Sequence, residues 1–231
     1  MESKGRQIHG EAANARERGE SIESLKLTDE AIKAYQEEGD LLGLAEVLVD
    51  RSITFRHLYD ASGDKNYLVI AKHEAQAGVE IARKSNQKEA LPIPLARLAN
   101  VQTDLGEFDE ATKNYQEAVE AMSSNPPSQH NRPAVVVDMK AHLATTEYKS
   151  GDKSALERAE KALSELEQTD EADYNKHVWV SGAHMRIAEM LINDDPQKAK
   201  EHLQKAKEII DADPSLTIRA QQWEKLAQKF S

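Results

Sequence analysis

The stretch Leu98–Ala118, LANVQTDLGEFDEATKNYQEA, reads as two short helices separated by a turn at Gly106. A Leu-Ala pair opens the stretch on the first helix. The second helix places small and aromatic residues at helical spacing on one face. Those face residues are Phe108, Ala111, Tyr115 and Ala118. The stretch therefore predicts a helical hairpin whose two helices approach each other closely.

The same hairpin pattern returns along the chain at a fixed step. Alanines of the second helix recur every 44 residues, at Ala111, Ala155 and Ala199. Upstream the step is 40 residues, from Ala31 to Ala71 and from Ala71 to Ala111. A constant period of this length is typical of stacked helical repeats. We therefore predict an all-α array of about five helix-turn-helix units.

We predict that residues 1–231 form a single domain built from these units. Their approximate ranges are 3–39, 40–85, 88–123, 133–168 and 172–211, with a C-terminal capping helix at 214–230. The polar stretch 3–18 favours helix through its alanines, and a frayed end is the alternative. Residues 123–133, SSNPPSQHNRP, form the longest break. A domain boundary there is the alternative, but the 44-residue step continues across it.

Prolines and acidic residues predict where several helices begin. Pro92 opens the first helix of the third unit, where a missing N–H would be unpaired in any case. The pair Asp195-Pro196 predicts an N-cap followed by proline at the first helical position. The pair Asp213-Pro214 repeats that arrangement and predicts the start of the capping helix.

The hairpin at 98–118 resembles a tetratricopeptide repeat (TPR), through the residues named above and the prolines at 126 and 127 that follow it. The resemblance covers most of the chain and implies a right-handed α-solenoid. The step of 40 to 44 residues is longer than the usual 34 of this family. It resembles the long repeats of kinesin light chains and cell-polarity adaptors.

Some units depart from the family pattern. The aromatic position becomes Ala159 in the fourth unit and Leu203 in the fifth, where Asp195 also replaces the turn glycine. In the second unit Phe55-Arg56 stands where a Leu-Ala pair is expected. The register of the first two units is therefore left open.

In this family the first helix of each unit lines a concave groove, and ligands are usually extended peptides. Carried over to this sequence, the groove positions flank each Leu-Ala or Ile-Ala pair. The candidates are Arg97, Asn100, Thr103 and Asp104 in the third unit, His142, Thr145, Tyr148 and Lys149 in the fourth, and Met185, Arg186, Glu189 and Asn193 in the fifth.

Three of these candidates suggest a way of holding a peptide. Asn100 could clamp a peptide backbone with its donor and acceptor. Arg97 and Arg186 could each hold a carboxylate in bidentate fashion. Only one such Asn is present, so the full carboxylate clamp of chaperone-tail binders is missing. Ordinary solvated side chains are the alternative interpretation of all these positions.

Nothing in the sequence predicts a metal or catalytic centre. His177 and His184 lie seven residues apart and can share a helix face, with His202 on the following helix. A metal site needs three convergent ligands with supporting contacts, so we prefer surface or groove histidines. The chain has no Cys, and no phosphate-binding loop, HExxH or nucleophile-elbow motif is present. We predict no cofactor, no metal and no catalytic residue.

The charge of the chain disfavours nucleic acid and anionic membranes as partners. Up to Tyr115 it carries 15 Lys and Arg against 21 Asp and Glu, and beyond it 15 against 20. Neither half has the basic footprint that phosphate binding requires. No apolar run approaches the roughly 20 residues that span a bilayer, and the N-terminus lacks a signal-peptide core. We expect a soluble, cytoplasmic protein with protein or peptide partners.

We therefore expect a non-enzymatic adaptor or scaffold that binds a peptide or a protein in its concave groove. One alternative is a protein that self-associates through apolar residues such as Tyr59, Tyr67 or Trp179. The other is a regulatory protein in which a small molecule or signal peptide changes the curvature of the superhelix. An enzyme is the least favoured class, because the motifs that would support one are missing.

Overall fold

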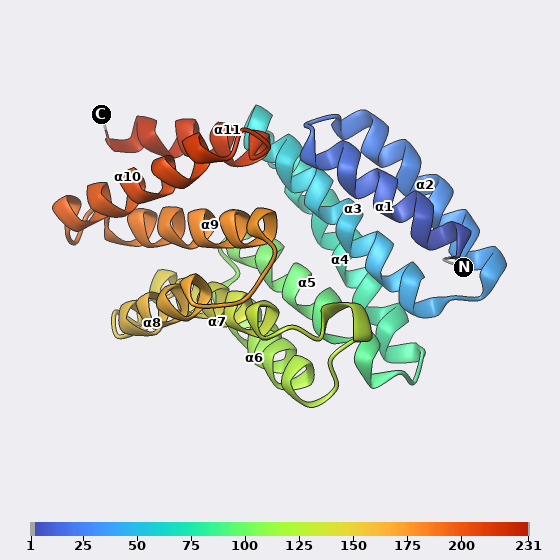
Figure 1. The fold of residues 1–231 in the computed structure, drawn as a ribbon. Helices are drawn as coiled ribbons and strands as arrows, with labels where there is room; N and C mark the ends of the chain where they lie inside the picture. Colours follow the sequence, from blue (N-terminus) through green and yellow to red (C-terminus); the bar gives the residue numbers. More distant parts are fainter. Residues whose placement is uncertain (1–2, 231) are drawn as a thin grey trace. The chain divides into compact units, whose positions relative to one another are not determined.

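The computed structural model describes residues 3–230, which form helices and no β-strand (Figure 1). The α-helices of this part of the chain are α1 Lys4–Glu17, α2 Ser21–Glu38, α3 Leu41–Ser62, α4 Asn66–Lys84, α5 Pro92–Leu105, α6 Phe108–Ser124, α7 Pro133–Lys149, α8 Ala155–Glu167, α9 Asp173–Leu191, α10 Pro196–Ala212 and α11 Thr217–Ala227. Short 3-10 segments lie at Lys88–Ala90, Ser128–His130 and Gln228–Phe230. The predicted all-α fold is confirmed. Within residues 3–230 no helix combines the length and apolar character needed to cross a membrane.

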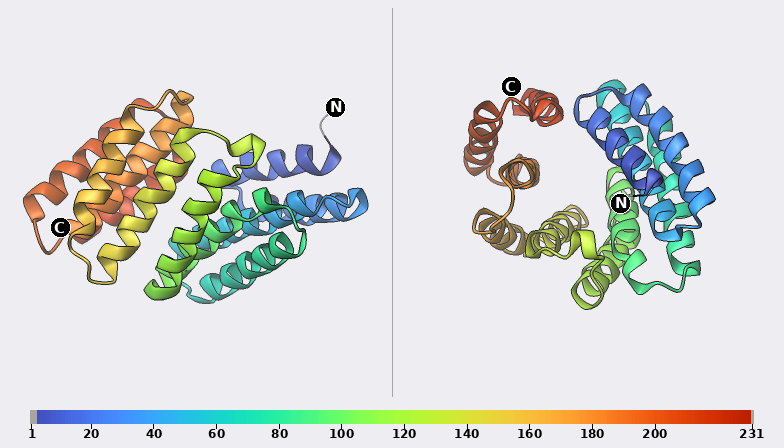
Figure 2. Two further views of the ribbon diagram at one scale, coloured as in Figure 1. Left: turned by 90° about the horizontal axis from the view of Figure 1, so that it is seen from below. Right: turned by 45° about the vertical axis from the view of Figure 1, so that its right-hand side comes forward.

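The chain divides into two compact units, Met1–His130 and Asn131–Ser231. Unit 1 contains α1 to α6, and unit 2 contains α7 to α11. Consecutive helices pair as hairpins, α1 with α2, α3 with α4 and α5 with α6 in unit 1, and α7 with α8 and α9 with α10 in unit 2 (Figures 1 and 2). The division falls inside the predicted loop 123–133. A single domain over residues 1–231 stays a prediction.

Helix ends follow local backbone chemistry at most of the predicted positions. Gly106 ends α5 with φ of +81°, a left-handed conformation that glycine adopts without strain. Asp195 caps α10, because its side chain accepts a hydrogen bond from the Lys198 backbone N–H at 3.1 Å. Pro92 and Pro196 occupy first turns as predicted, where no helical hydrogen bond is lost.

Two boundary predictions are resolved by the structure. The stretch 3–18 forms α1 and is not frayed, with Ser3 as its N-cap. The start predicted at Asp213-Pro214 is wrong, because α11 begins at Thr217. The Asp213 carboxylate instead accepts a hydrogen bond from the Ser215 backbone N–H at 3.1 Å. It also lies 2.8 Å from Nδ1 of His177, so it is engaged away from α11.

In unit 1, Tyr35 fills the space between α1, α2 and α3. Its side chain is 0% exposed and packs in a cluster with Ala31 and Val47. The ring fits because glycines face it. A Cβ at Gly43 would lie 2.2 Å from Tyr35 Cε1, and one at Gly5 would lie 2.5 Å from Tyr35 Cδ1. Without these two glycines, α1 and α3 could not approach the ring so closely.

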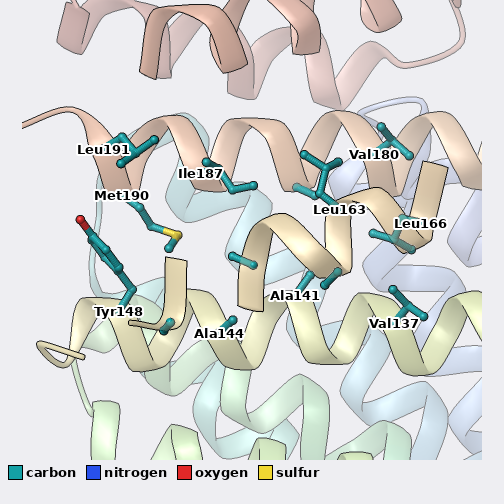
Figure 3. Close-up of a cluster of buried hydrophobic side chains, with 14 of the residues drawn as sticks. Val137, Ala141, Ala144, Tyr148, Leu163, Leu166, Val180, Ile187, Met190 and Leu191 are labelled. Atoms are coloured by element: carbon teal, nitrogen blue, oxygen red, sulfur yellow. The ribbon is translucent and has the colours of Figure 1, made fainter. Parts of the chain in front are cut away.

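In unit 2, an apolar cluster joins α7, α8 and α9 (Figure 3). Larger side chains such as Leu163, Leu166 and Ile187 fill the space, and small residues let the backbones approach. The alanines at the 44-residue step, Ala111 in unit 1 and Ala155 and Ala199 in unit 2, are all 0% exposed. The repeating alanine is therefore fully buried in each of these three hairpins.

Candidate functional site

The first helices of the hairpins pack side by side within each unit, and their charged side chains pair across the helix boundaries. In unit 1, α3 packs against α1 and α5, and in unit 2, α9 packs against α7 and α11. The unit 1 face consists of Arg6, His9, Arg16, Glu46, Asp50 and Arg97. The unit 2 face consists of Asp138, His142, Lys149, Gly182, Arg186, Glu189, Arg219 and Lys229.

Glu46 is one centre of the unit 1 face, and its side chain is 6% exposed. Arg6 of α1 donates to Glu46 Oε2 at 2.8 Å. Gln129, from the loop after α6, donates to Glu46 Oε1 at 2.7 Å, and His130 Nε2 lies 3.7 Å from the same oxygen. The Glu46 carboxylate of α3 therefore binds both α1, through Arg6, and the C-terminal end of unit 1, through Gln129.

Asp50 is the second centre of the unit 1 face. Its Oδ2 lies 3.1 Å from Nε2 of His9 and 3.6 Å from Nη1 of Arg16. Nδ1 of His9 lies 3.2 Å from the buried Tyr35 hydroxyl, which extends the network into the core. Burial alone would raise the pKa of Asp50, but Arg16, His9 and Arg97 outweigh it and hold this pKa well below its ordinary value. Asp50 is therefore an anion fixed among cations.

Two of the predicted candidates on α5 bond to their own helix. Asn100 is 5% exposed, and its Nδ2 donates to Ala96 O at 3.1 Å. Thr103 donates from its hydroxyl to Ala99 O at 2.8 Å. The amide of Asn100 is therefore committed to its own helix, and clamping a peptide would require that bond to break.

The other two candidates on α5 are charged and behave differently. Asp104 accepts a hydrogen bond from Nε of Arg56 at 2.6 Å, so it joins α5 to α3. Arg97 lies within the field of Asp50, but its buried Nε has no hydrogen-bond partner. A buried donor without an acceptor is costly, so Arg97 is the α5 candidate with an unmet hydrogen-bonding group.

Ion pairs join α9 to its neighbours on the unit 2 face. Arg186 donates from Nη2 to Asp138 of α7 at 3.3 Å. Glu189 accepts from Lys149 at 2.8 Å and from Lys229 at 2.7 Å. Burial would raise the pKa of Glu189, but the two lysines lower it to about 2. Of the four candidates that the sequence predicts in the fifth unit, Arg186 and Glu189 therefore form ion pairs with side chains outside α9.

Three of the candidates in unit 2 are largely buried, with Thr145 at 4%, Tyr148 at 6% and Met185 at 7% exposure. Thr145 donates to Ala141 O at 2.8 Å. Tyr148 donates to Asp194, and Met185 packs in an apolar cluster between α9, α10 and α11. These three side chains support the fold, and they offer little surface to a ligand.

Two candidates in unit 2 remain, and they lie in different settings. His142 lies on α7 with Nε2 3.7 Å from Asp138 Oδ1, beside Arg186. Asn193 is exposed in the turn between α9 and α10. His142 therefore shares the unit 2 face with Arg186, whereas Asn193 lies beyond the end of α9.

The histidine interpretation is partly wrong. His184 and His202 are not surface residues, because they are 2% and 9% exposed, and their Nδ1 atoms lie 2.9 Å apart. Burial and the neighbouring His202 lower the pKa of His184 to about 4. His177 does not join them and contacts Asp213 instead. In the described part of the chain, no group of three His, Cys, Asp or Glu is placed to hold a metal ion.

Charge is distributed unevenly between the first and second helices. In unit 1, α1, α3 and α5 carry 6 Lys and Arg against 6 Asp and Glu, whereas α2, α4 and α6 carry 6 against 11. In unit 2, α7, α9 and α11 carry 6 against 5, whereas α8 and α10 carry 6 against 7. An acidic ligand would therefore be repelled less by the first helices than by the second.

A shallow hollow of about 250 Å³ lies elsewhere in unit 1, next to the start of α5 and the C-terminal half of α6. Its lining includes Lys88, Glu117 and Asn125, and none of the predicted candidates lines it. It therefore offers no support for the site predicted from the sequence.

Sequence reasoning missed Glu46, Asp50 and Asp138, which organise the two faces, and also Gly182 and Arg219. One signal could have found some of them. Glu46 and Asp50 are four residues apart on a first helix, as are Gly182 and Arg186, which places each pair on one stripe of its helix.

No protein-family model matches the chain, and no curated protein matches it. Solved structures do match it. A Podosopora anserina protein of nearly identical TPR-like repeats, named for kinesin light chain, superposes with a TM-score of 0.56 at 18% identity, covering 90% of this chain and 97% of its own. BtubC (BKLC) from P. vanneervenii superposes with a TM-score of 0.59 at 22% identity, covering 89% of this chain and 79% of its own. At these identities the likeness concerns the fold, and the chain is an all-α solenoid with the TPR-like repeat fold.

Proposed function

We propose that the chain is a non-enzymatic adaptor that binds a peptide or protein partner on the faces formed by its first helices. One observation carries the proposal. Arg97 and Arg186 each precede the Leu-Ala or Ile-Ala pair of their hairpin, and each has a buried Nε without a hydrogen-bond partner. Buried donors are normally paired. The Nε atoms of Arg51 and Arg132 are also buried without a partner, and of these four arginines Arg97 and Arg186 are the two that directly precede a Leu-Ala or Ile-Ala pair.

The repeat fold and the charge distribution support the same proposal. Stacked helical hairpins present an extended surface instead of a single enclosed cavity. The first helices lack the excess of negative charge that the second helices carry in unit 1. A partner segment with acidic or neutral side chains is therefore compatible with the unit 1 and unit 2 faces.

The experiment compares the partners captured by three forms of the purified full chain from a lysate of the source cells. The first is wild type, and the second carries Arg97→Gln and Arg186→Gln. The third is a matched control, Lys84→Gln and Lys161→Gln, which removes one cation from a second helix of each unit. These control lysines are exposed at 80% and 77% of their side chains.

A partner held by wild type and by the control, and lost from the arginine variant, is the expected result. Circular dichroism and thermal unfolding of each variant show whether the loss comes from the surface or from the fold. Equal capture by all three forms, or no specific capture by wild type, would contradict binding on these faces.

Self-association is the second candidate, but not through the residues that the sequence suggested. Tyr67 packs against the cluster of Phe55, and Trp179 packs against the core of unit 2 beneath the guanidinium of Arg132. Tyr59 is only partly exposed. The core of each unit therefore uses most of this apolar surface.

Other apolar residues are available for self-association. Ile22 of α2 is 65% exposed, and Val69 and Ile70 of α4 are 49% and 40% exposed. Leu25 of α2 and Tyr67 of α4 pack against the same cluster around Phe55, so the N-terminal ends of these two helices lie toward the same end of α3. The exposed side chains thus lie at one end of unit 1, where a second copy could cover them.

A further inference from the structure

Helix α11 buries fewer residues than any other α-helix within residues 3–230. Leu226 is the one residue of α11 that is buried, whereas each other α-helix in this range buries at least four. Local opening costs the least free energy where few buried contacts have to break. Helix α11 is therefore the helix that we expect to separate from its unit most readily.

Side-chain contacts hold α11 and the residues after it against α9 and α10. Arg219 donates from Nε to a backbone carbonyl of α9 at 3.1 Å, and Trp223 donates from Nε1 to Leu203 O of α10 at 2.9 Å. Lys229 pairs with Glu189 at 2.7 Å, but the lysine side chain is 52% exposed, so this pair adds little stability. Trp223 is therefore the main anchor, because an indole combines a large apolar area with an N–H donor.

Helix α11 covers an apolar seam where α9 meets α10. The side chains of this α9–α10 seam are Met185, Ala188, Leu203 and Ala206, each at most 7% exposed. The residues of α11 and of the turn after it that pack in the same cluster are Trp223, Leu226, Ala227 and Phe230. Their spacing is i, i+3, i+4 and i+7, so the seam accepts one stripe of an amphipathic helix. A detached α11 would leave this apolar surface in water until another helix covers it.

The connection between α10 and α11 can open without disturbing either helix. It consists of residues 213–216, because α10 ends at Ala212 and α11 begins at Thr217. Two backbone hydrogen bonds fold it back, from Leu216 N–H to Asp213 O at 3.1 Å and from Thr217 N–H to Ser215 O at 2.9 Å. Four extended residues span about 13–14 Å. The connection therefore has the properties of a hinge that can carry α11 away from its own seam.

We infer that α11 exchanges between two copies of the chain, so that α11 of each copy occupies the α9–α10 seam of the other. The occupant is a second copy because every copy carries a helix that matches the seam in spacing and in polar groups. Arg219 and Trp223 would donate to the same backbone carbonyls across the two copies as they do within one. Each copy gives one helix and receives one, so the exchange closes as a two-fold dimer.

This inference does not rest on the adaptor proposal, and it concerns a different surface from the exposed residues of α2 and α4. It lies entirely within unit 2, since α9, α10 and α11 all belong to that unit. The exchanged dimer and a dimer formed through Ile22 and Val69 therefore respond to different substitutions.

The first experiment supplies α11 as a separate molecule. The probe is a fluorescein-labelled peptide of residues 214–230, and fluorescence anisotropy gives its affinity for the full chain. The tethered α11 of wild type competes at an effective concentration of about a millimolar, so wild type should bind the peptide weakly. Trp223→Ala in the chain loosens the tethered helix and should strengthen binding of the wild-type peptide by about tenfold or more. The control is Gln221→Ala, at an exposed residue of α11, which should bind as wild type does.

Two further variants test the contacts of the bound peptide. A peptide that carries Trp223→Ala should not bind, because it lacks the anchor. Gly182→Ala, added to the Trp223→Ala chain, should weaken binding of the wild-type peptide, since a Cβ at Gly182 would lie 3.1 Å from Nη2 of Arg219. If Trp223→Ala fails to fold by circular dichroism, Leu226→Ala takes its place with the same expectations.

The second experiment measures the mass of the full chain by light scattering at rising concentration. We expect wild type and Gln221→Ala to form a dimer, and Trp223→Ala to form less of it, because its α11 has lost the anchor in either copy. The variant Ile22→Ser with Val69→Ser should keep the dimer, since it leaves unit 2 unchanged.

Four results would overturn the inference. The first two are no binding of the peptide by the Trp223→Ala chain and equal binding of the two peptides. The third is peptide binding by a chain that stays monomeric at every concentration, which would assign the seam to a helix of another protein. The fourth is a dimer that survives Trp223→Ala and is lost with Ile22→Ser and Val69→Ser, which would place the contact on α2 and α4.

Discussion

The buried pair of His184 and His202 predicts that unit 2 loses stability in mild acid. The Nδ1 atoms of the two rings lie 2.9 Å apart, so one ring donates and the other must accept. Protonation of both rings would place two donors and two positive charges face to face in a buried site. The perturbation is a fall in pH from about 7.5 to about 5, compared between wild type and His184→Asn. Asparagine keeps a hydrogen-bonding group near the position of Nδ1 and does not titrate.

The magnitude follows from the pKa of His184, which is about 4 in the folded chain against an ordinary value of 6.5. Since the folded pKa lies below the unfolded one, the unfolded chain binds the proton first. Stability from this residue is therefore complete above about pH 6.5 and is lost as the pH falls toward 4. The full loss is about 3 kcal/mol, of which about 2 kcal/mol is gone by about pH 5. Burial and its neighbours also lower the pKa of His202, which acts in the same direction.

Other charged groups around the pair must be held constant for the comparison. Glu167 of α8 lies 3.6 Å from Nε2 of His184, and Lys205, Lys198, Glu160 and Glu201 act on the pair from α8 and α10. All of these side chains are present in both proteins, so the difference between the two proteins reports His184 together with its contacts. The matched control is His73→Asn, because His73 is an exposed residue of α4 in unit 1.

The assay is urea unfolding followed by tryptophan fluorescence. Both tryptophans of the chain, Trp179 and Trp223, lie in unit 2, so the signal reports the unit that contains the pair. We expect wild type to lose about 2 kcal/mol more than His184→Asn between the two pH values, and His73→Asn to follow wild type. Equal pH dependence of wild type and His184→Asn would refute the reasoning, whatever the stability of the variant at neutral pH.

Two further predictions concern unit 1. Gly43→Ala should destabilise this unit by about 1–3 kcal/mol, because its Cβ would lie 2.2 Å from Tyr35 Cε1, and hydrogen exchange of the α2 and α3 amides would show it. Gly10→Ala on α1 is the control, since nothing lies within 4 Å of its Cβ and helix propensity should make it neutral or stabilising; similar effects of the two substitutions would contradict the packing argument. If Ile22 and Val69 form a contact between copies, Ile22→Ser with Val69→Ser should convert a concentration-dependent dimer into a monomer in light scattering. A wild-type chain that is monomeric at all concentrations would remove self-association.

The helical hairpins could be predicted because their signals are local. Ala111, Ala155 and Ala199 mark close helix packing, since a small side chain at a fixed step is needed wherever two backbones approach. The cap at Asp195 follows from two adjacent residues and needs no knowledge of the fold. The pair at Asp213 failed because its carboxylate has a distant partner, His177, which no local pattern reveals.

The polar contacts of the two faces could not be predicted from the sequence. A charged residue on one side of a helix gives the same sequence pattern whether its side chain is solvated or ion-paired. The sequence places Arg186 and Glu189 on one stripe of a helix, but their ionic partners come from α7 and from the segment after α11. The sequence suggests Asn100 as a clamp for a peptide backbone, yet its amide donates to the backbone one turn earlier. Sequence spacing identifies the stripe, and only the packing of neighbouring helices decides which of its side chains stay available.

The way in which α1 is attached has a consequence for biosynthesis. The buried residues of α1 are Gly5, His9, Ala12 and Ala15, so it offers almost no large apolar side chain to the rest of the unit. Its ionic partners on α3, Glu46 and Asp50, follow Arg6 and His9 by 40 and 41 residues. At typical translation speeds the ribosome needs roughly 2–8 s to make that length of chain. During that interval α2 is available to α1 and α3 is not, so the ionic contacts of α1 form only when α3 emerges with its two carboxylates.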